Sequence, residues 1–484
     1  MSLCTRLKQS KLGLPACLTA ALLAGCAVGP DYQRITPGQA APEQFRATVP
    51  AAGPHLVEPY VWWSGFQDGG LDTLVQRALL HSPDIASADA SIAQARAGIT
   101  QTASARDVQV NGAGRVGRDQ FSRDSENFAN IPFSNPATGF TDYRGGLDAS
   151  WEIDLFGHIA RNVESARAKA GAVELQRQDV ALRVSAETAR NVLDYRHLQL
   201  RLANASAILK DNREVLRLVQ LQRRAGVVSD MDVKQAEIGV SNAQSMLPSL
   251  EAALQTSITA MIPLTGLPQE DIASELGHTE DQAVLPEAAS FAVSSQVLER
   301  RPDVRIAERQ LAAATADIGA AMADQYPRFT LVGGAGWDSI HPGQFGQQAS
   351  RYWNFGPQLY LPILNGNHVQ AAIKQAEAAH DAALANYRKA VLAALADVES
   401  AMLRCQGDHG RLTKLDAAVK LQNDQIMLTQ QRVDVGEAPQ FDVLNAQIQR
   451  SNLVEQQLAT RQALAEDLVL LYKALGGRGD VAMD

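Results

Sequence analysis

The sequence predicts a mixed α/β membrane protein in which each chain supplies four transmembrane β-strands and two long helical hairpins. Three observations support this fold class: a lipoprotein-type leader, an internal two-fold repeat, and four segments in which apolar and polar residues alternate. Alternation with a period of two over about 10 residues is typical of membrane-spanning strands. Apolar residues spaced alternately three and four apart are typical of helices that pack along one seam.

Residues 1–25 have the pattern of a bacterial lipoprotein signal peptide. Basic residues precede a short apolar stretch (12–24), which ends in Leu23-Ala24-Gly25-Cys26. Small residues before a cysteine are recognised by lipoprotein signal peptidase, so we expect cleavage before Cys26 and acylation of its thiol. Acyl chains would anchor the chain without a transmembrane helix. Ala27 rather than Asp favours the outer membrane, and an ordinary secretory signal with an incidental cysteine is the alternative.

Composition excludes several classes of protein. The net charge of −9 argues against a general nucleic-acid binder, and 46% hydrophobic with 20% charged residues argues against disorder. The sequence contains no run of 18 apolar residues of the kind that forms a spanning helix. Once Cys4 and Cys17 leave with the leader and Cys26 is acylated, Cys405 has no partner for a disulfide. Cys405 is expected to be a small packing residue.

The second half of the chain repeats the first. Identical residues recur at an offset of 210 without a gap: Leu182 and Leu392, Gly226 and Gly436, Asp232 and Asp442, Ala236 and Ala446, Gly266 and Gly476. Upstream, Ser82-Pro83-Asp84-Ile85 matches Arg301-Pro302-Asp303-Val304 at an offset of 219. Each half is therefore expected to contain a helix, two strands and a long helical hairpin.

The hairpins are expected at 158–262 and 368–475. Their seam is clearest in the return helix of the first, at Val233, Ala236, Val240, Ala243, Leu247, Leu250 and Leu254. The outgoing helix would reach roughly 100 Å at 1.5 Å per residue. We expect an interruption near Asn204 or Asp211, and a kink at Pro248.

Strands are expected at about 107–117, 140–154, 328–338 and 352–364. In the second, for example, Leu147, Ala149 and Trp151 share one face while Asp148, Ser150 and Glu152 share the other. Such strands direct apolar side chains to lipid and polar ones to a lumen. Four half-buried strands of a soluble sheet are the alternative, and the lipoprotein leader favours the membrane.

Four strands cannot close a barrel, and an open sheet edge in lipid would leave backbone groups without partners. The chain must therefore obtain the remaining strands from other copies. Three copies of four strands give 12, an even number within the known range. We expect a homo-oligomer with a hollow axis.

The predicted organisation follows from these elements. We expect a signal peptide at 1–25, an anchored extended segment at 26–70, repeat 1 at 71–266, a linker at 267–292, repeat 2 at 293–476 and a tail at 477–484.

Several motifs together resemble the TolC-like outer-membrane efflux factors, specifically the NodT-type lipoproteins of tripartite exporters. They are Gly29-Pro30-Asp31-Tyr32 after the leader, Trp62-Trp63 with Phe66 and Leu71, Trp151 to Gly157, Leu298 to Arg305, and the two turn segments 224–233 and 435–444. The resemblance covers nearly all of the mature chain.

This resemblance implies a trimer with one 12-stranded outer-membrane barrel and 12 long helices that form a periplasmic tunnel. It implies a passive exit duct, neither an enzyme nor a cofactor protein, whose partners are a periplasmic adaptor and an energised inner-membrane transporter. The alternatives are a lipid-anchored coiled-coil scaffold and a type I protein secretion duct. The cargo and the type of transporter are not encoded in this sequence.

The resemblance also implies where the adaptor contacts and the gate lie. The contacts would be the turns Gly226, Val227, Val228 and Ser229, and Gly436, Glu437, Ala438 and Pro439. The gate would follow the second turn, at Phe441, Asp442 and Asn445. Relatives often carry Asp before the Ala-Gln pair, where Asn445 stands, so Asp442 or Asp434, paired with Arg432, could provide the acidic ring instead. A solvated helix end is the alternative for all five.

No pattern points to catalysis. Gly112, Gly114 and Gly117 match a dinucleotide fingerprint, but that fingerprint must lie between a strand and a helix, whereas here it lies within an alternating segment. The histidines lack metal-ligand spacing. His158 and His368 occupy the same repeat position after a strand, where a structural role is expected.

Overall fold

The computed structural model describes residues 27–35, 61–120, 122, 139–277, 285 and 299–477. The predicted signal peptide (1–25) and lipidation site Cys26 lie outside the described residues, as do parts of the predicted linker (267–292) and tail (477–484). None of the helices in the described part of the chain combines the length and the apolar character needed to cross a bilayer.

The chain folds as two compact units, each built from both halves of the sequence. Unit 1 comprises Met1–Arg34, Ala93–Gly171 and Arg309–Ala385, and unit 2 comprises Ile35–Ile92, Ala172–Glu308 and Asn386–Asp484. The division therefore does not follow the predicted repeats 71–266 and 293–476.

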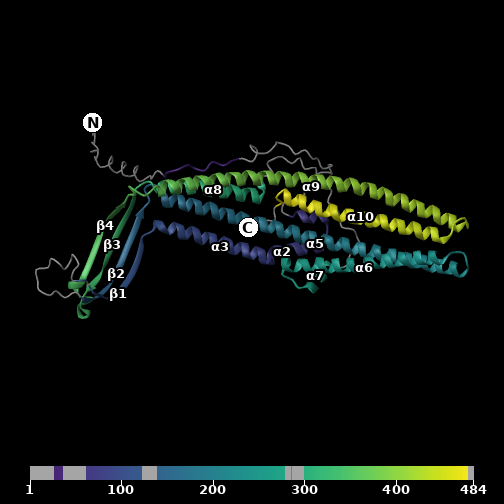
Figure 1. Ribbon diagram of the computed structural model, residues 1–484, viewed down its shortest axis with the longest axis horizontal. Coiled ribbons are helices and arrows are strands. Elements are labelled where there is room, and N and C mark those ends of the chain that lie inside the picture. Colours follow the sequence, from purple (N-terminus) through teal and green to yellow (C-terminus); the bar gives the residue numbers. More distant parts are fainter. Residues whose placement is uncertain are drawn as a thin grey trace, which may run out of the picture. The chain divides into compact units, whose positions relative to one another are not determined.

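Unit 1 contains a four-stranded antiparallel sheet in the order β1-β2-β3-β4 (Figure 1). The strands are β1 (Gln109–Gln120), β2 (Gly139–Ile153), β3 (Arg328–Ser339) and β4 (Arg351–Tyr360). The fourth strand was expected to reach residue 364 and is shorter, because its partner β3 begins at Arg328, which pairs with Tyr360. Pro362 also lacks an amide hydrogen for a further ladder bond.

The strand register places the four apolar faces on one side of the sheet. Leu147 pairs with Ala335, which pairs with Trp353. The opposite face carries the polar side chains of Asn111, Asp148 and Asn354 in one row, with Gly334 at the β3 position of that row. The sheet is therefore apolar on one face and polar on the other.

Long helices form two hairpins. The first is α5 (His158–Arg224) with α6 (Asp230–Thr265), and the second is α9 (His368–Asp434) with α10 (Gln440–Ala474). The expected interruption near Asn204 or Asp211 is wrong, since α5 is continuous through both. The Asn204 amide donates to the Ser451 carbonyl on α10 (2.9 Å), so its side chain does not compete for the backbone bonds of its own helix.

Shorter elements complete the fold. Among the described residues they include α2 (Gly69–His81), α3 (Pro83–Ala103), α7 (Gln269–Leu276), α8 (Pro302–Ala323) and the 3-10 turns Trp62–Phe66, Ser104–Arg106, Pro342–Gln344 and Gln348–Ser350. The main core of unit 2 gathers around Trp62, Trp63 and Phe66, all almost fully buried. Beside it Arg196 donates to both carboxylate oxygens of Asp68 (2.8 and 3.1 Å).

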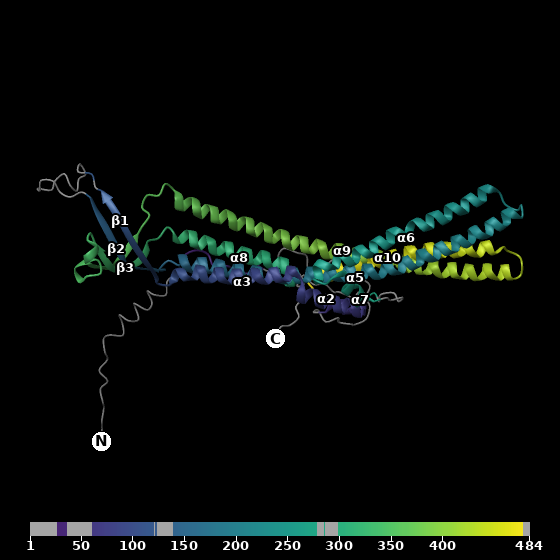
Figure 2. The same ribbon diagram turned by 90° about the horizontal axis from the view of Figure 1, so that it is seen from below.

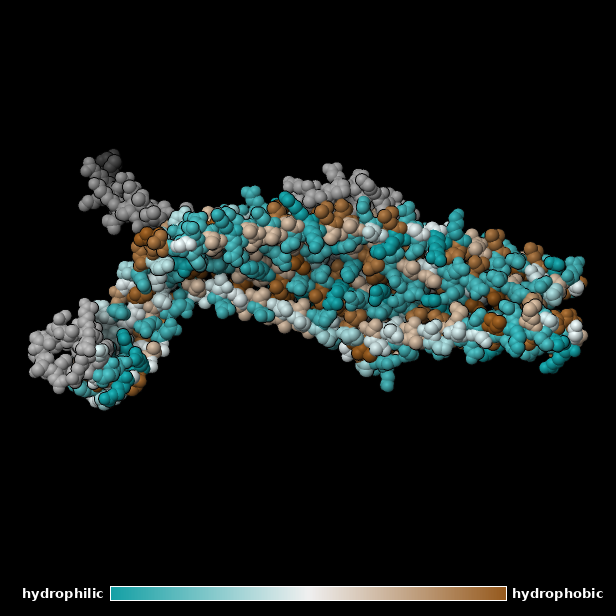
Figure 3. Space-filling view, in the orientation of Figure 1, coloured by the Kyte–Doolittle hydropathy of each residue, from teal (hydrophilic) through white to brown (hydrophobic). Residues whose placement is uncertain are grey.

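The two hairpins run together within unit 2, and their turns lie at the same end of it (Figures 1 and 2). On the face seen in Figure 3, hydrophilic and hydrophobic residues are interspersed over the helices, without one continuous apolar stripe. Narrow seams of this kind favour side-by-side packing of helices over burial in a thick core.

Candidate functional site

The first tip is the turn from α5 to α6, residues 225–229. Gly226 has a φ of +76°, a conformation that favours glycine. The Gly226 amide donates to the Arg223 carbonyl (3.0 Å), and the Val227 amide donates to the Gln222 carbonyl (2.9 Å). These two bonds form the Schellman arrangement, which ends α5 at this point.

The second tip is the turn from α9 to α10, residues 435–439, and its backbone is the same. Gly436 has a φ of +78°. Its amide donates to the Val433 carbonyl (3.0 Å), and the Glu437 amide donates to the Arg432 carbonyl (2.8 Å). Glycines 210 residues apart therefore end the two long helices in the same way.

Side chains fasten the first tip. Ser229 and Asp232 cap each other, since the Asp232 amide donates to Ser229 Oγ (3.4 Å) and the Ser229 amide donates to the Asp232 carboxylate (2.7 Å). Arg223 donates to both carboxylate oxygens of Asp230 (2.6 and 3.1 Å), and this hydrogen-bonded pairing lowers the pKa of Asp230. The end of α5 is thus joined to the start of α6.

The second tip lacks these fastenings. Pro439 occupies the position of Ser229, and proline has neither a hydroxyl nor an amide hydrogen. No side-chain hydrogen bond caps α10 at this residue. Val433 and Gln440 occupy the positions of Arg223 and Asp230, and neither can form an ion pair. Among the described residues, the backbone arrangement and apolar packing hold this turn.

Phe441, predicted to lie at the gate, is partly buried. It packs against a cluster of Val215, Val219 and Leu444, as does Val228 of the first tip. The ring therefore contributes to the apolar contact between the two hairpins just behind their turns.

The polar gate candidates are more open. Asp442 is exposed and Asn445 is half-buried, while Arg432 and Asp434 are both exposed. The Asp434 carboxylate accepts a hydrogen bond from the Gln430 amide (2.8 Å). In the described part of the chain Arg432 forms no ion pair with either aspartate, so the pairing considered from the sequence is absent within a single chain.

Further along, polar contacts join α5 to α10. Arg201 pairs with Glu455 (2.7 Å), and the Gln462 amide donates to Asp194 (3.0 Å). Burial, and then the nearby Asp194 carboxylate, raise the pKa of Glu466 to about 7. The interface between the hairpins therefore carries a carboxyl group that is protonated more readily than usual.

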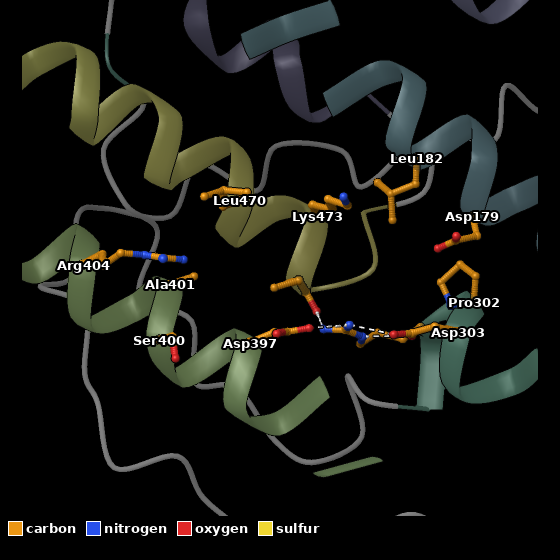
Figure 4. A pocket seen from close by; sticks show the side chains of 12 residues that line it. Asp179, Leu182, Pro302, Asp303, Asp397, Ser400, Ala401, Arg404, Leu470 and Lys473 are labelled. Atoms are coloured by element: carbon orange, nitrogen blue, oxygen red, sulfur yellow. Dashed lines mark hydrogen bonds and ion pairs between the residues drawn. The ribbon is translucent and has the colours of Figure 1, made fainter. Parts of the chain in front are cut away.

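A cavity of about 550 Å³ lies where α8 begins beside α9 and the end of α10 (Figure 4). Its charged lining residues are three acids, Asp179, Asp303 and Asp397, and three bases, Arg301, Arg404 and Lys473. Because the charges balance, the cavity does not favour a ligand of either sign.

Arg301 uses all its donors within the chain. Its side chain is 9% exposed. Nε and Nη2 donate to Asp303 (3.0 and 2.7 Å), Nη2 also to Asp397 (3.0 Å), and Nη1 to the carbonyls of Ala394 (3.4 Å) and Ala474 (2.9 Å). Arg301 therefore fastens the end of α10 to α8 and α9, and has no donor left for a ligand.

Other chemistry-bearing residues have structural surroundings. Among the described residues, no three His, Cys, Asp or Glu side chains are grouped so as to hold a metal ion. The three glycines of the fingerprint-like segment lie inside β1, which pairs with β2. Cys405 is buried in the core, and burial raises the pKa of its thiol to about 12. Its expected packing role is confirmed.

Sequence reasoning missed the fastening of the first tip. Ser229 with Asp232 fits the capping pattern of a hydroxyl residue followed three positions later by an acid, and that pattern could have identified it. The contacts of Arg301 with Ala394, Ala474 and Asp397 carried no local signal, because these partners lie on α9 and α10.

The amphipathic four-stranded sheet and the paired helical hairpins define an outer-membrane efflux protein. The sequence profile described as "Outer membrane efflux protein" matches residues 74–267 and 293–477. The chain belongs to this family. Both the predicted family and the predicted outer-membrane location are confirmed.

Individual relatives align over nearly their whole length. The chain is 30% identical to "Nodulation protein T" of Rhizobium leguminosarum bv. viciae, covering 96% of this chain and 93% of that protein. It is 30% identical to "Pyoverdine export outer membrane protein OpmQ" of Pseudomonas aeruginosa, covering 95% and 96%. The solved outer-membrane channel OprN aligns with a TM-score of 0.78 at 28% identity, covering 93% of this chain and 99% of that chain.

Proposed function

We propose that this protein is a passive homotrimeric exit duct of a tripartite efflux system. It receives substrates from an inner-membrane transporter through a periplasmic adaptor and releases them across the outer membrane. Membership of the outer membrane efflux protein family supports this proposal. The chain has no catalytic step of its own, and the transporter supplies the energy and selects the cargo.

The incomplete sheet is the observation that carries the proposal. β1 and β4 are the two edge strands, and in the described part of the chain no further strand pairs with the outer side of either one. Its apolar face is uncovered, with Trp353 80% and Phe355 71% exposed. In lipid both edges need partners, and three copies of four strands would close a 12-stranded barrel with the polar face toward the lumen.

The helices support the same stoichiometry. α5 and α9 each contain 67 residues, and each precedes one tip. We infer an internal two-fold repeat, so that three copies supply 12 long helices in a pseudo-sixfold periplasmic tunnel. Narrow seams along each helix suit neighbours on both sides.

We infer that the gate lies at the second tip. Phe441, Asp442 and Asn445, with Asp434 and Arg432 nearby, would line the constriction, and the residues of both tips named above would contact the adaptor. The lack of side-chain fastening at the second tip supports this assignment, since a moving turn must be held weakly. Phe441→Ala should raise single-channel conductance by removing bulk, and unchanged conductance would count against this placement.

The anchor is proposed to be acylated Cys26. Cys26→Ser should abolish incorporation of labelled palmitate. Palmitate that persists after this change would show that the anchor has been assigned to the wrong residue.

Planar-bilayer recording tests the proposed function as a whole. Protein purified from the outer-membrane fraction should produce discrete ion-conducting steps, because a closed barrel holds a water-filled lumen. A lipid-anchored scaffold with soluble β segments would be released from membranes by lipase treatment and would produce no steps.

A further inference from the structure

The start of the described chain is attached to the junction between β2 and α5. The Val28 amide donates to the Phe156 carbonyl (3.2 Å). Gly157 has a φ of +81°, and a Cβ placed on it would lie 2.8 Å from both Cα and Cβ of Ala27. Ala27 therefore packs directly on the backbone at the junction, in a space that only glycine leaves open.

Arg161, on the first turn of α5, binds this segment. Its side chain is 5% exposed. Nε donates to the Val28 carbonyl (3.2 Å), and Nη2 donates to the Gly29 carbonyl (3.3 Å) and to the Asp31 carboxylate (2.8 Å). Nη1 donates to Glu164 on the same helix (2.8 Å). A single guanidinium thus satisfies three acceptors of a segment more than 120 residues away in sequence.

Two further glycines make room for the contact. A Cβ on Gly319 of α8 would lie 2.9 Å from Cγ, Cδ and Nε of Arg161. Gly29 has a φ of +100°, and a Cβ there would lie 2.5 Å from the Gly319 Cα. The segment is therefore enclosed between α5 and α8, at a spacing that no larger residue permits.

We propose that Arg161, Gly157 and Gly319 form a docking site for the chain's own N-terminal segment, residues 27–31, and that this site fixes where the lipid anchor begins relative to the sheet. The residue before Ala27 is Cys26, so a lipid on Cys26 would start next to a docked backbone. The second part of this proposal rests on the proposed acylation of Cys26. The docking itself does not.

The Arg161 guanidinium, with several N–H donors in one plane, is well suited to holding this segment. Guanidinium bonds to two carbonyls and a carboxylate are directional, and they are stronger in a nearly buried site than at the surface. Lysine could place a charge there but could not reproduce this planar set of donors.

Spin labelling tests the docking. Gln33→Cys places a label on an exposed residue two positions after Asp31. The buried thiol of Cys405, with its pKa raised to about 12, stays unlabelled. In detergent-purified full-length protein the label should show a slow-motion spectrum. Arg161→Met should shorten its rotational correlation time several-fold, and Gly319→Ala, which displaces the Arg161 side chain, should do the same.

Gly98→Ala is the matched control. Gly98 also lies inside a helix, α3, and a Cβ there would meet nothing within 4 Å. This variant should leave the spectrum unchanged, so a response to Gly319→Ala cannot come from helix propensity. The helical circular dichroism signal should stay constant in all variants, which separates loss of docking from unfolding.

A label that is already mobile in the parent protein, or that stays immobile in Arg161→Met, would overturn the docking site. Palmitate labelling of the same preparations should be equal in the parent and in Arg161→Met, because processing precedes folding. Absence of palmitate from the parent would contradict the proposed anchor and leave the docking result standing.

Discussion

The two helical hairpins are fastened at opposite ends. The first is fastened at its tip, through Arg223 with Asp230 and through Ser229 with Asp232. The second is fastened at its base, where Arg301 binds the last turn of α10. At the position in the first half that corresponds to Arg301, Ser82 is buried and its hydroxyl has no hydrogen-bond partner among the described residues.

From this difference we expect the second tip to move more readily than the first. Both tips share one backbone arrangement, so the contrast lies in side chains alone. A hairpin held firmly at its base and loosely at its turn can swing its tip while the rest of unit 2 stays packed. Of the four predictions that follow, three remove this contrast or measure it, and one concerns pH at the contact between α5 and α10.

The largest effect is expected at the base of the second hairpin. Arg301→Met leaves two buried carbonyls and two carboxylates without their donor, and should lower the free energy of unfolding by about 3 kcal/mol. Arg177→Met is the control, because Arg177 forms only a partly exposed pair with Asp89 and should cost less than about 1 kcal/mol. Thermal melts followed by circular dichroism measure both variants. Equal decreases in melting temperature would contradict the conclusion that Arg301 holds the base of the second hairpin.

The second prediction concerns pH at the contact between α5 and α10. The pKa of Glu466 is raised to about 7. A carboxyl whose pKa is raised by folding stabilises the protein below its unfolded pKa, and this stability is lost as pH rises through about 7. Glu466→Gln should therefore make the protein more stable at pH 8 by about 1–2 kcal/mol, a value discounted for partial exposure.

The matched control for this effect is Glu455→Gln on the same helix. Glu455 pairs with Arg201, so its neutralisation should lower stability at pH 8. Melting temperatures recorded from pH 5 to pH 8 give both results. A Glu466→Gln variant as pH-dependent as the parent, and no more stable at pH 8, would refute the assignment.

A smaller effect is expected at the first tip. Asp232→Ala removes one half of the capping box and should reduce local stability by about 1 kcal/mol. Asp442→Ala, at the matching position of the second tip, should change little, because Pro439 has no amide hydrogen for Asp442 to accept. Amide hydrogen exchange over the first turns of α6 and α10 measures the pair, and equal increases in both would erase the contrast.

The smallest change in stability should come from grafting the fastening onto the second tip. Val433→Arg with Gln440→Asp recreates the exposed pair of Arg223 and Asp230, worth less than about 1 kcal/mol. It should nevertheless reduce the fraction of time for which the channel is open in planar bilayers. Amide hydrogen exchange should show that the turn of the double variant opens less often. If it does, and the open fraction of the channel is nevertheless unchanged, the gate does not lie at the second tip.

The sequence predicted what depends on local pattern. Alternation located all four strands, and glycines 210 residues apart located both turns, because these features are set by neighbours in the chain. It overextended the fourth strand, which ends at Tyr360, opposite the first residue of its antiparallel partner β3. The predicted interruption of α5 near Asn204 was wrong. The Asn204 side chain donates to the Ser451 carbonyl on α10 and so does not compete for the backbone hydrogen bonds of α5.

Contacts between distant segments could not be predicted. Arg301 and Arg161 each gather acceptors from two or more elements. The Arg-Pro-Asp motif drew attention to Arg301 and contains its partner Asp303, but its bonds to Asp397, Ala394 and Ala474 depend on the tertiary fold. Phe441 was predicted from the sequence to lie at the gate, and this stays a prediction, but its packing against Val215 and Val219 depends on how the two hairpins meet.

The copy number of the membrane-extracted protein tests the central claim most directly, since the described part of one chain offers a four-stranded sheet with two open edges. Native mass spectrometry of protein extracted from outer membranes should give the mass of three mature chains with their acyl groups. A stable single chain, recovered in solution without detergent, would contradict the account.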